Sequence, residues 1–207
     1  FFRDLAVHYF ATETMDTATF IDGVDHMLAL YAPQVTHCTH NLFSSHDVSR
    51  FLYEAEEDVT RLRLATLFQL TMPGAPGIYY GDEIAMSGGD DPDNRRGFPW
   101  DRPETWDRET LELTRTLIRL RKEHPALRLG SWRPVWQGDN AFAFERAVAG
   151  ERVLVVINRG DAIDRVNLPI SAKRAEVLWG QGQVEVDGES VGVIGVGARD
   201  GVIVRLS

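Results

Sequence analysis

Apolar residues along the first part of the chain recur at the three-to-four-residue spacing that predicts helices. This spacing occurs in four segments: residues 2–10, 17–31, 58–71 and 109–123. The second segment follows Asp16, a residue typical of a helix start, and Pro33 is expected to end it. The third segment is apolar on nearly every side, which predicts a helix buried on several faces.

Two short apolar runs lie between these helices and predict strands. The first covers residues 35–43 and leads into the polar turn at residues 44–47. The second covers residues 77–80, and a loop rich in Gly, Asp and Pro follows at residues 87–99. Because strands alternate with helices up to about residue 129, this part is predicted to be of the α/β class.

From residue 130 the pattern changes to closely spaced strands. The strand-like runs are residues 141–144, 153–157, 166–168, 176–178, 191–196 and 202–206, with Gly, Asp or Asn in the turns between them. Such spacing predicts an all-β, antiparallel sandwich or barrel. Two domains are therefore expected, residues 1–129 and residues 130–207.

Composition narrows the possible partners. The 207 residues carry a formal net charge of −9, and an acidic surface repels phosphate backbones, so no nucleic-acid partner is expected. No apolar run approaches the roughly 18 residues of a membrane span. Cys38 is the only cysteine, which excludes an internal disulfide and is consistent with a cytoplasmic protein. The start at Phe1, without a Met, indicates a piece of a longer chain.

The polar turn after the first predicted strand carries the clearest candidate chemistry. His46 and Asp47 follow a strand and precede a helix, which is where (β/α) barrels place catalytic groups. Taken alone, a His-Asp pair is more often an ordinary exposed turn. The surrounding motifs decide between the two interpretations.

Four segments, in order, carry a resemblance to the α-amylase family (glycoside hydrolase family 13). Residues 41–47 (NLFSSHD) resemble its fourth short motif, and residues 73–84 resemble its eighth barrel strand with the residues that directly follow this strand. Residues 91–100 resemble the next loop, and residues 117–122 resemble the final barrel helix. The loop is similar to that of neopullulanases, cyclomaltodextrinases and maltogenic amylases. The resemblance implies the C-terminal part of a (β/α)8 TIM barrel, with strands seven and eight, followed by a small antiparallel β-sandwich.

The resemblance also implies roles for four residues. Asp47 matches the third catalytic carboxylate of the family, which holds sugar hydroxyls at the cleaved bond and favours the distorted ring. His46 matches a hydrogen-bonding partner of the same sugar, and Asp91 and Arg95 match positions that hold the neighbouring sugar. The implied substrate is an α-glucan oligosaccharide (maltooligosaccharide, cyclomaltodextrin or pullulan), and neither a cofactor nor a metal ion is expected.

Two carboxylates of the family have no match in this chain. The nucleophile and the acid/base belong after the fourth and fifth barrel strands, upstream of these residues. A barrel takes about 250 residues, and only about 128 precede the predicted sandwich. The resemblance thus implies a fragment of a retaining α-glucan hydrolase, inactive alone, which the missing barrel portion or a second copy of the chain completes.

Two carboxylates and two histidines allow other interpretations. Asp82 or Glu83 could act as a second carboxylate beside Asp47, because neighbouring strand ends lie close together. The favoured alternative is that these two residues fix their own loop. His37 and His40 would face opposite sides of a strand, so no shared metal ion is expected.

Two further possibilities concern binding. A calcium loop at Asp91 and Asp93 is excluded because Arg95 and Arg96 occupy positions that need a ligand and a glycine. Trp100 follows the predicted sugar-binding loop and is the tryptophan expected to stack on a sugar. The alternative function is a non-catalytic carbohydrate-binding or interaction module that uses the β-sandwich. Sugar contacts would then fall after residue 130.

Overall fold

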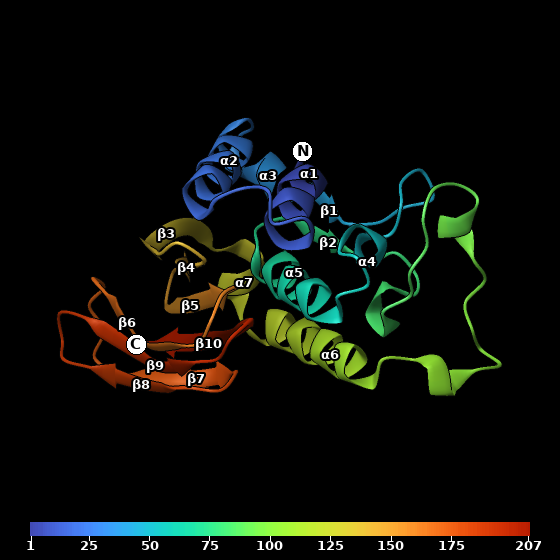
Figure 1. Ribbon diagram of the computed structural model, residues 1–207. Helices are drawn as coiled ribbons and strands as arrows, with labels where there is room; N and C mark the ends of the chain where they lie inside the picture. Colours follow the sequence, from blue (N-terminus) through green and yellow to red (C-terminus); the bar gives the residue numbers. More distant parts are fainter. The chain divides into compact units, whose positions relative to one another are not determined.

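The computed structural model describes residues 1–207, and helices dominate its first 129 residues (Figure 1). The α-helices are α1 (Phe2–Ala6), α2 (Thr17–Ala29), α3 (Pro33–Thr36), α4 (Phe51–Glu54), α5 (Val59–Thr71), α6 (Arg108–Glu123) and α7 (Pro125–Leu129). A π-helical segment, η1 (Val7–Ala11), continues α1, and three 3-10 turns are η2 (Asp82–Ile84), η3 (Asp93–Arg95) and η4 (Pro103–Thr105). The four predicted helices are confirmed, and no helix has the length and apolar character needed to cross a membrane.

The prediction of a strand at residues 35–43 is wrong for the first half of this segment. Pro33 begins the short helix α3 instead of directly ending α2, since the fixed φ of proline suits a first helical position. His37 caps the end of α3, so the argument from opposite strand faces does not apply to it. Only β1 (His40–Leu42) is a strand.

Strand β1 pairs in parallel with β2 (Ala75–Gly77), which starts and ends earlier than the predicted strand at 77–80. Helix α5 is tied to both strands because the Gln69 side chain donates to the carbonyls of Asn41 and Gly77, both at 2.9 Å. Gly77 packs closely on His40, since a Cβ atom at position 77 would lie 2.0 Å from His40 Nε2.

The core beside these strands is aromatic. Phe68 of α5 packs with ring centroids 5.8 Å from Phe2, 5.5 Å from Phe10 and 5.2 Å from Phe20. The apolar residues of α5 are buried around most of its circumference: Leu62, Leu64, Ala65, Leu67, Phe68 and Leu70. The prediction of a helix buried on several sides is thereby confirmed.

After α7 the chain forms antiparallel sheets, as the strand spacing predicts. The strands are β3 (Ser131–Gln137), β4 (Ala141–Val148), β5 (Glu151–Asn158), β6 (Ile163–Leu168), β7 (Ala175–Trp179), β8 (Gln183–Val186), β9 (Val191–Val196) and β10 (Asp200–Leu206). Their orders are β3-β4-β5-β10-β7 and β6-β9-β8. Residues of both sheets, such as Leu154, Val193 and Val204, share one buried apolar cluster. Strands β3 and β8 were not predicted, because Pro134 interrupts one and the other is short and polar.

The chain divides into two compact units, one of Phe1–Leu70 with Gly74–Arg119 and one of Thr71–Pro73 with Leu120–Ser207. The expected boundary at residue 129 lies further along the chain. Buried guanidinium groups account for the difference. Arg121 donates to the carbonyls of Met72 and Leu127 at 2.8 and 2.7 Å, and Arg146 donates to that of Thr71.

Candidate functional site

The turn between β1 and α4 presents His46 and Asp47 to solvent. Their side chains are 68% and 73% exposed, and His46 Nε2 lies 3.4 Å from a carboxylate oxygen of Asp47. The turn is tight, because the Asp47 N–H donates to the Ser45 hydroxyl at 3.1 Å and Ser45 forms an isolated bridge with Val48. The Asp47 carboxylate is therefore available to a ligand.

The loop that carries Asp91 and Arg95 contacts this turn. Arg95 Nε donates to the His46 carbonyl oxygen at 3.0 Å and lies 3.1 Å from Asp91 Oδ1. The four residues singled out in the sequence thus lie together although two loops carry them. Asp91 and Arg95 remain 58% and 46% exposed, so both retain polar atoms for a ligand.

Asn94 lies beneath the turn and is fully buried. Its Nδ2 donates to the carbonyl oxygens of Val48 at 2.8 Å and Ser45 at 3.3 Å. These carbonyls flank His46 and Asp47 on both sides. Asn94 therefore joins the two loops from below while Arg95 joins them at the surface.

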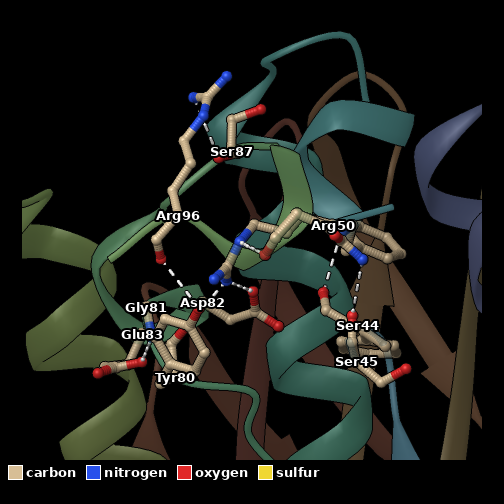
Figure 2. A network of polar contacts seen from close by, with 12 residues as sticks. Ser44, Ser45, Arg50, Tyr80, Gly81, Asp82, Glu83, Ser87 and Arg96 are labelled. Carbon is tan, nitrogen blue, oxygen red and sulfur yellow. Dashed lines mark hydrogen bonds and ion pairs between the residues drawn. The ribbon is translucent and has the colours of Figure 1, made fainter. Parts of the chain in front are cut away.

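Arg50, also fully buried, connects this arrangement to the end of β2. Its guanidinium donates to the carbonyls of Asn94 at 3.1 Å and Tyr80 at 2.8 Å, and to Asp82 Oδ1 at 3.1 Å. Figure 2 shows Arg50 directed at Tyr80 and Asp82. The guanidinium carbon also lies 4.5 Å from the Tyr79 ring centroid. The sequence motifs did not identify Arg50 and Asn94 as part of the site. Their position within a few residues of Asp47 and Arg95 was the only indication in the sequence that they belong to it.

The two carboxylates after β2 take part in local contacts. Glu83 accepts the Gly81 N–H at 2.7 Å, and Asp82 pairs with Arg50. Burial raises the pKa of Asp82 to about 7, although Ser44 and Arg50 favour its ionised form. These contacts fit the interpretation that Asp82 and Glu83 fix their own loop.

Because the pKa of Asp82 is raised, this group is expected to stabilise the folded chain more at acid pH than at neutral pH. The group titrates near 3.8 when unfolded and near 7 when folded, so its contribution is complete below 3.8 and is lost as the pH rises through 7. Asp82→Asn should remove this pH-dependent contribution. The slope of the unfolding free energy against pH, between pH 5 and 7, should then change by up to about 1.4 kcal/mol per pH unit.

Urea unfolding at several pH values measures this slope. Asp107→Asn is the matched control, because hydrogen bonds to Thr110 and Arg63 outweigh burial and lower the pKa of Asp107. Its titration lies below the measured window, so its slope should equal that of the unsubstituted chain. An unchanged slope in Asp82→Asn would show that Asp82 is ionised throughout.

A partly exposed aromatic cluster follows the Asp91–Arg95 loop. The Phe98 ring centroid lies 4.2 Å from Trp100 and 5.4 Å from Trp106, and Trp106 Nε1 donates to the Pro99 carbonyl at 3.1 Å. Trp100 is 73% exposed. Stacking on a sugar stays a prediction for this residue.

The family model of the α-amylase catalytic domain matches residues 1–108. Cyclomaltodextrinase of Geobacillus thermopakistaniensis is 40% identical over 172 residues, which cover 82% of this chain and 29% of that protein. Neopullulanase 2 of Thermoactinomyces vulgaris is 40% identical over 164 residues, which cover 77% of this chain and 28% of that protein. The crystal structure of a debranching enzyme from Nostoc punctiforme aligns with a TM-score of 0.88 at 28% identity, over 98% of this chain and 46% of that one.

Because the family model matches more than half of its residues, the chain belongs to the α-amylase family. The names of its relatives agree with the branch inferred from the loop at residues 91–100. The predicted resemblance to this branch of the family is therefore confirmed. The chain spans less than a third of the length of these two relatives.

Proposed function

We propose that this chain is part of a retaining α-glucan hydrolase and supplies Asp47 as the carboxylate that stabilises the transition state. The observation that carries the proposal is the bridge formed by Arg95, which contacts Asp91 and the His46 carbonyl. Two sequence motifs of the family, separated by more than forty residues, thereby meet at one exposed surface. The proposed substrates are α-1,4-linked glucans such as maltooligosaccharides, cyclomaltodextrins or pullulan.

The chemistry of the turn suits this role. Retaining glycosidases pass through an oxocarbenium-like state in which contacts to sugar hydroxyls strengthen. An ionised carboxylate makes such contacts in their stronger, charge-assisted form, and the imidazole of His46 is the only titratable group within 4 Å of the Asp47 carboxylate. The planar guanidinium of Arg95 holds Asp91 and can direct further N–H groups at a neighbouring sugar.

We also propose that the nucleophile and the acid/base come from residues outside these 207. The small share of the curated relatives that the chain covers supports this division. Asp82 and Glu83, the carboxylates nearest in sequence to the end of β2, are occupied by Arg50 and the Gly81 N–H. The chain would thus contribute substrate positioning and charge, and the rest of the enzyme would contribute bond making and proton transfer.

Two substitutions in the longer enzyme distinguish this proposal from a sugar-binding module on the antiparallel sheets. His46→Ala should lower kcat/KM about fivefold, because it removes a neutral hydrogen bond worth about 1 kcal/mol. Trp179→Ala, on half-buried β7, should leave kcat/KM unchanged. Steady-state kinetics on a maltooligosaccharide measure both, and the reverse pattern would favour the alternative function.

We further propose that the α/β part is completed by other barrel strands or by a second copy of the chain. Strands β1 and β2 pair only with each other. Six large hydrophobic residues of the same unit are 39–59% exposed: Phe1, Leu30, Tyr31, Val35, Tyr53 and Ile78. Apolar surface is worth about 25 cal/mol per Å² when it is buried, so a covering partner would stabilise this unit.

Light scattering coupled to size exclusion tests the need for such a partner. The purified chain should be heavier than 23.3 kDa, or its α/β part should melt separately from the antiparallel sheets. A 23.3 kDa monomer that melts in a single cooperative step would refute this part of the proposal.

A further inference from the structure

We propose that Asn94 is a positioning residue for Asp47, and that its buried amide fixes the turn that carries the carboxylate. The inference rests on the proposed function, in which Asp47 contacts the sugar. Asn94 itself is fully buried and takes no part in sugar binding. It acts by holding the backbone on either side of the residues that do.

The hydrogen bonds of Asn94 support this role. Both bonds of its Nδ2 end on the turn, at the carbonyls of Ser45 and Val48. Between Ser45 and Val48 lie only His46 and Asp47. Without the amide, the carbonyls of Ser45 and Val48 would each lose one hydrogen bond, and the direction of the Asp47 side chain would be less constrained.

Asn94 is in turn held by a rigid group. Arg50 donates to its carbonyl oxygen at 3.1 Å, and Arg50 is itself anchored on Tyr80 and Asp82. The path from the end of β2 to the Asp47 turn therefore runs through buried groups of fixed geometry. Asn94 also stands between Asp91 and Arg95, so one short segment positions the catalytic turn and presents both predicted sugar contacts.

Two buried polar atoms of this cluster have no hydrogen-bond partner. They are Asn94 Oδ1 and Arg50 Nη2. Unsatisfied buried groups are rare and costly, and a functional constraint is one reason for their retention.

Asn158 in the other unit provides a matched control. It is 1% exposed, and its Nδ2 donates to the carbonyls of Asp161 at 2.7 Å and Gly197 at 2.9 Å. Unlike Asn94, it also satisfies its Oδ1, which accepts the Gly160 N–H at 3.0 Å. Loss of its amide should therefore cost stability without affecting the turn.

The test compares Asn94→Ala, Asn158→Ala and Asp47→Asn in the longer enzyme, by steady-state kinetics on a maltooligosaccharide and by thermal melting. Asn94→Ala should lower kcat about 10-fold to 100-fold, because a displacement near 1 Å can cost that much, while KM changes less than about threefold. Asn158→Ala should lower Tm and leave kcat unchanged. If Asn94→Ala does not fold, Asn94→Ser retains one donor and should show a smaller loss of kcat.

The outcomes separate this inference from the proposed function. Equal kcat values for the Asn94 and Asn158 variants, with a low kcat for Asp47→Asn, would overturn only the positioning role. A normal kcat in Asp47→Asn would overturn the proposed function and this inference with it. Faster amide hydrogen exchange at residues 45–48 in Asn94→Ala, and not in Asn158→Ala, is the expected structural signature, and its absence would also contradict the proposal.

Discussion

Replacing Asp47 by Asn in the longer enzyme is expected to lower kcat about 100-fold to 1000-fold with little change in KM. The amide keeps the size of the side chain but loses the charge that strengthens hydrogen bonds to sugar hydroxyls. A contact of this kind tightens in the transition state and contributes several kcal/mol, and each 1.36 kcal/mol is a factor of ten in rate. An interaction made mainly in the transition state affects kcat more than KM.

The local structure around Asp47 indicates that this substitution should affect catalysis without affecting folding. The Asp47 side chain is 73% exposed, and the His46 ring at 3.4 Å is the only titratable group near it, so Asp47→Asn should leave Tm nearly unchanged. Asp91→Asn is the companion variant, because its predicted contact is with the neighbouring sugar and its loss should mainly raise KM. A kcat for Asp47→Asn within a few-fold of the unsubstituted enzyme would show that the assigned role is wrong.

The purified 207-residue chain is expected to release no reducing sugar from α-1,4-glucans, cyclomaltodextrins or pullulan. Hydrolysis with retention needs a nucleophile and an acid/base, and in the proposed division neither lies in this chain. Removing one essential catalytic group commonly costs a factor of about 10⁴ to 10⁶ in kcat. Any residual rate should therefore lie below detection in a reducing-sugar assay.

Substitutions identify the source of any activity that did appear. Asp82 is the carboxyl with a pKa of about 7, which suits an acid catalyst, but Arg50 holds it. Activity that vanished in Asp47→Asn and in Glu83→Gln would show that these two residues form the catalytic pair. It would contradict the proposed division of the site.

Much of the fold follows from local sequence patterns. Helix α2 begins where Asp16 accepts the Thr19 N–H at 2.8 Å, and that cap is visible in the sequence. Helix α5 is buried nearly all round because its apolar residues are distributed nearly all round. The strand expected at residues 35–43 failed in its first half because Pro33 favours a helix start, a local preference that the apolar run concealed.

The candidate site was predictable only in part. Family motifs identified His46, Asp47, Asp91 and Arg95, because each lies in a short segment with recognisable neighbours. Contacts between segments more than forty residues apart are set by the tertiary fold, so the sequence did not reveal the pairing of Arg95 with the His46 carbonyl. For the same reason it did not reveal Asn94, whose partners belong to the other loop.

The position of a bound sugar tests the assignment of the site most directly. In a crystal of the longer enzyme grown with a maltooligosaccharide, one sugar ring should lie within hydrogen-bond distance of Asp47 and His46. The adjacent ring should contact Asp91 or Arg95. A sugar bound only to residues after 130, with none at Asp47, would contradict the proposed function.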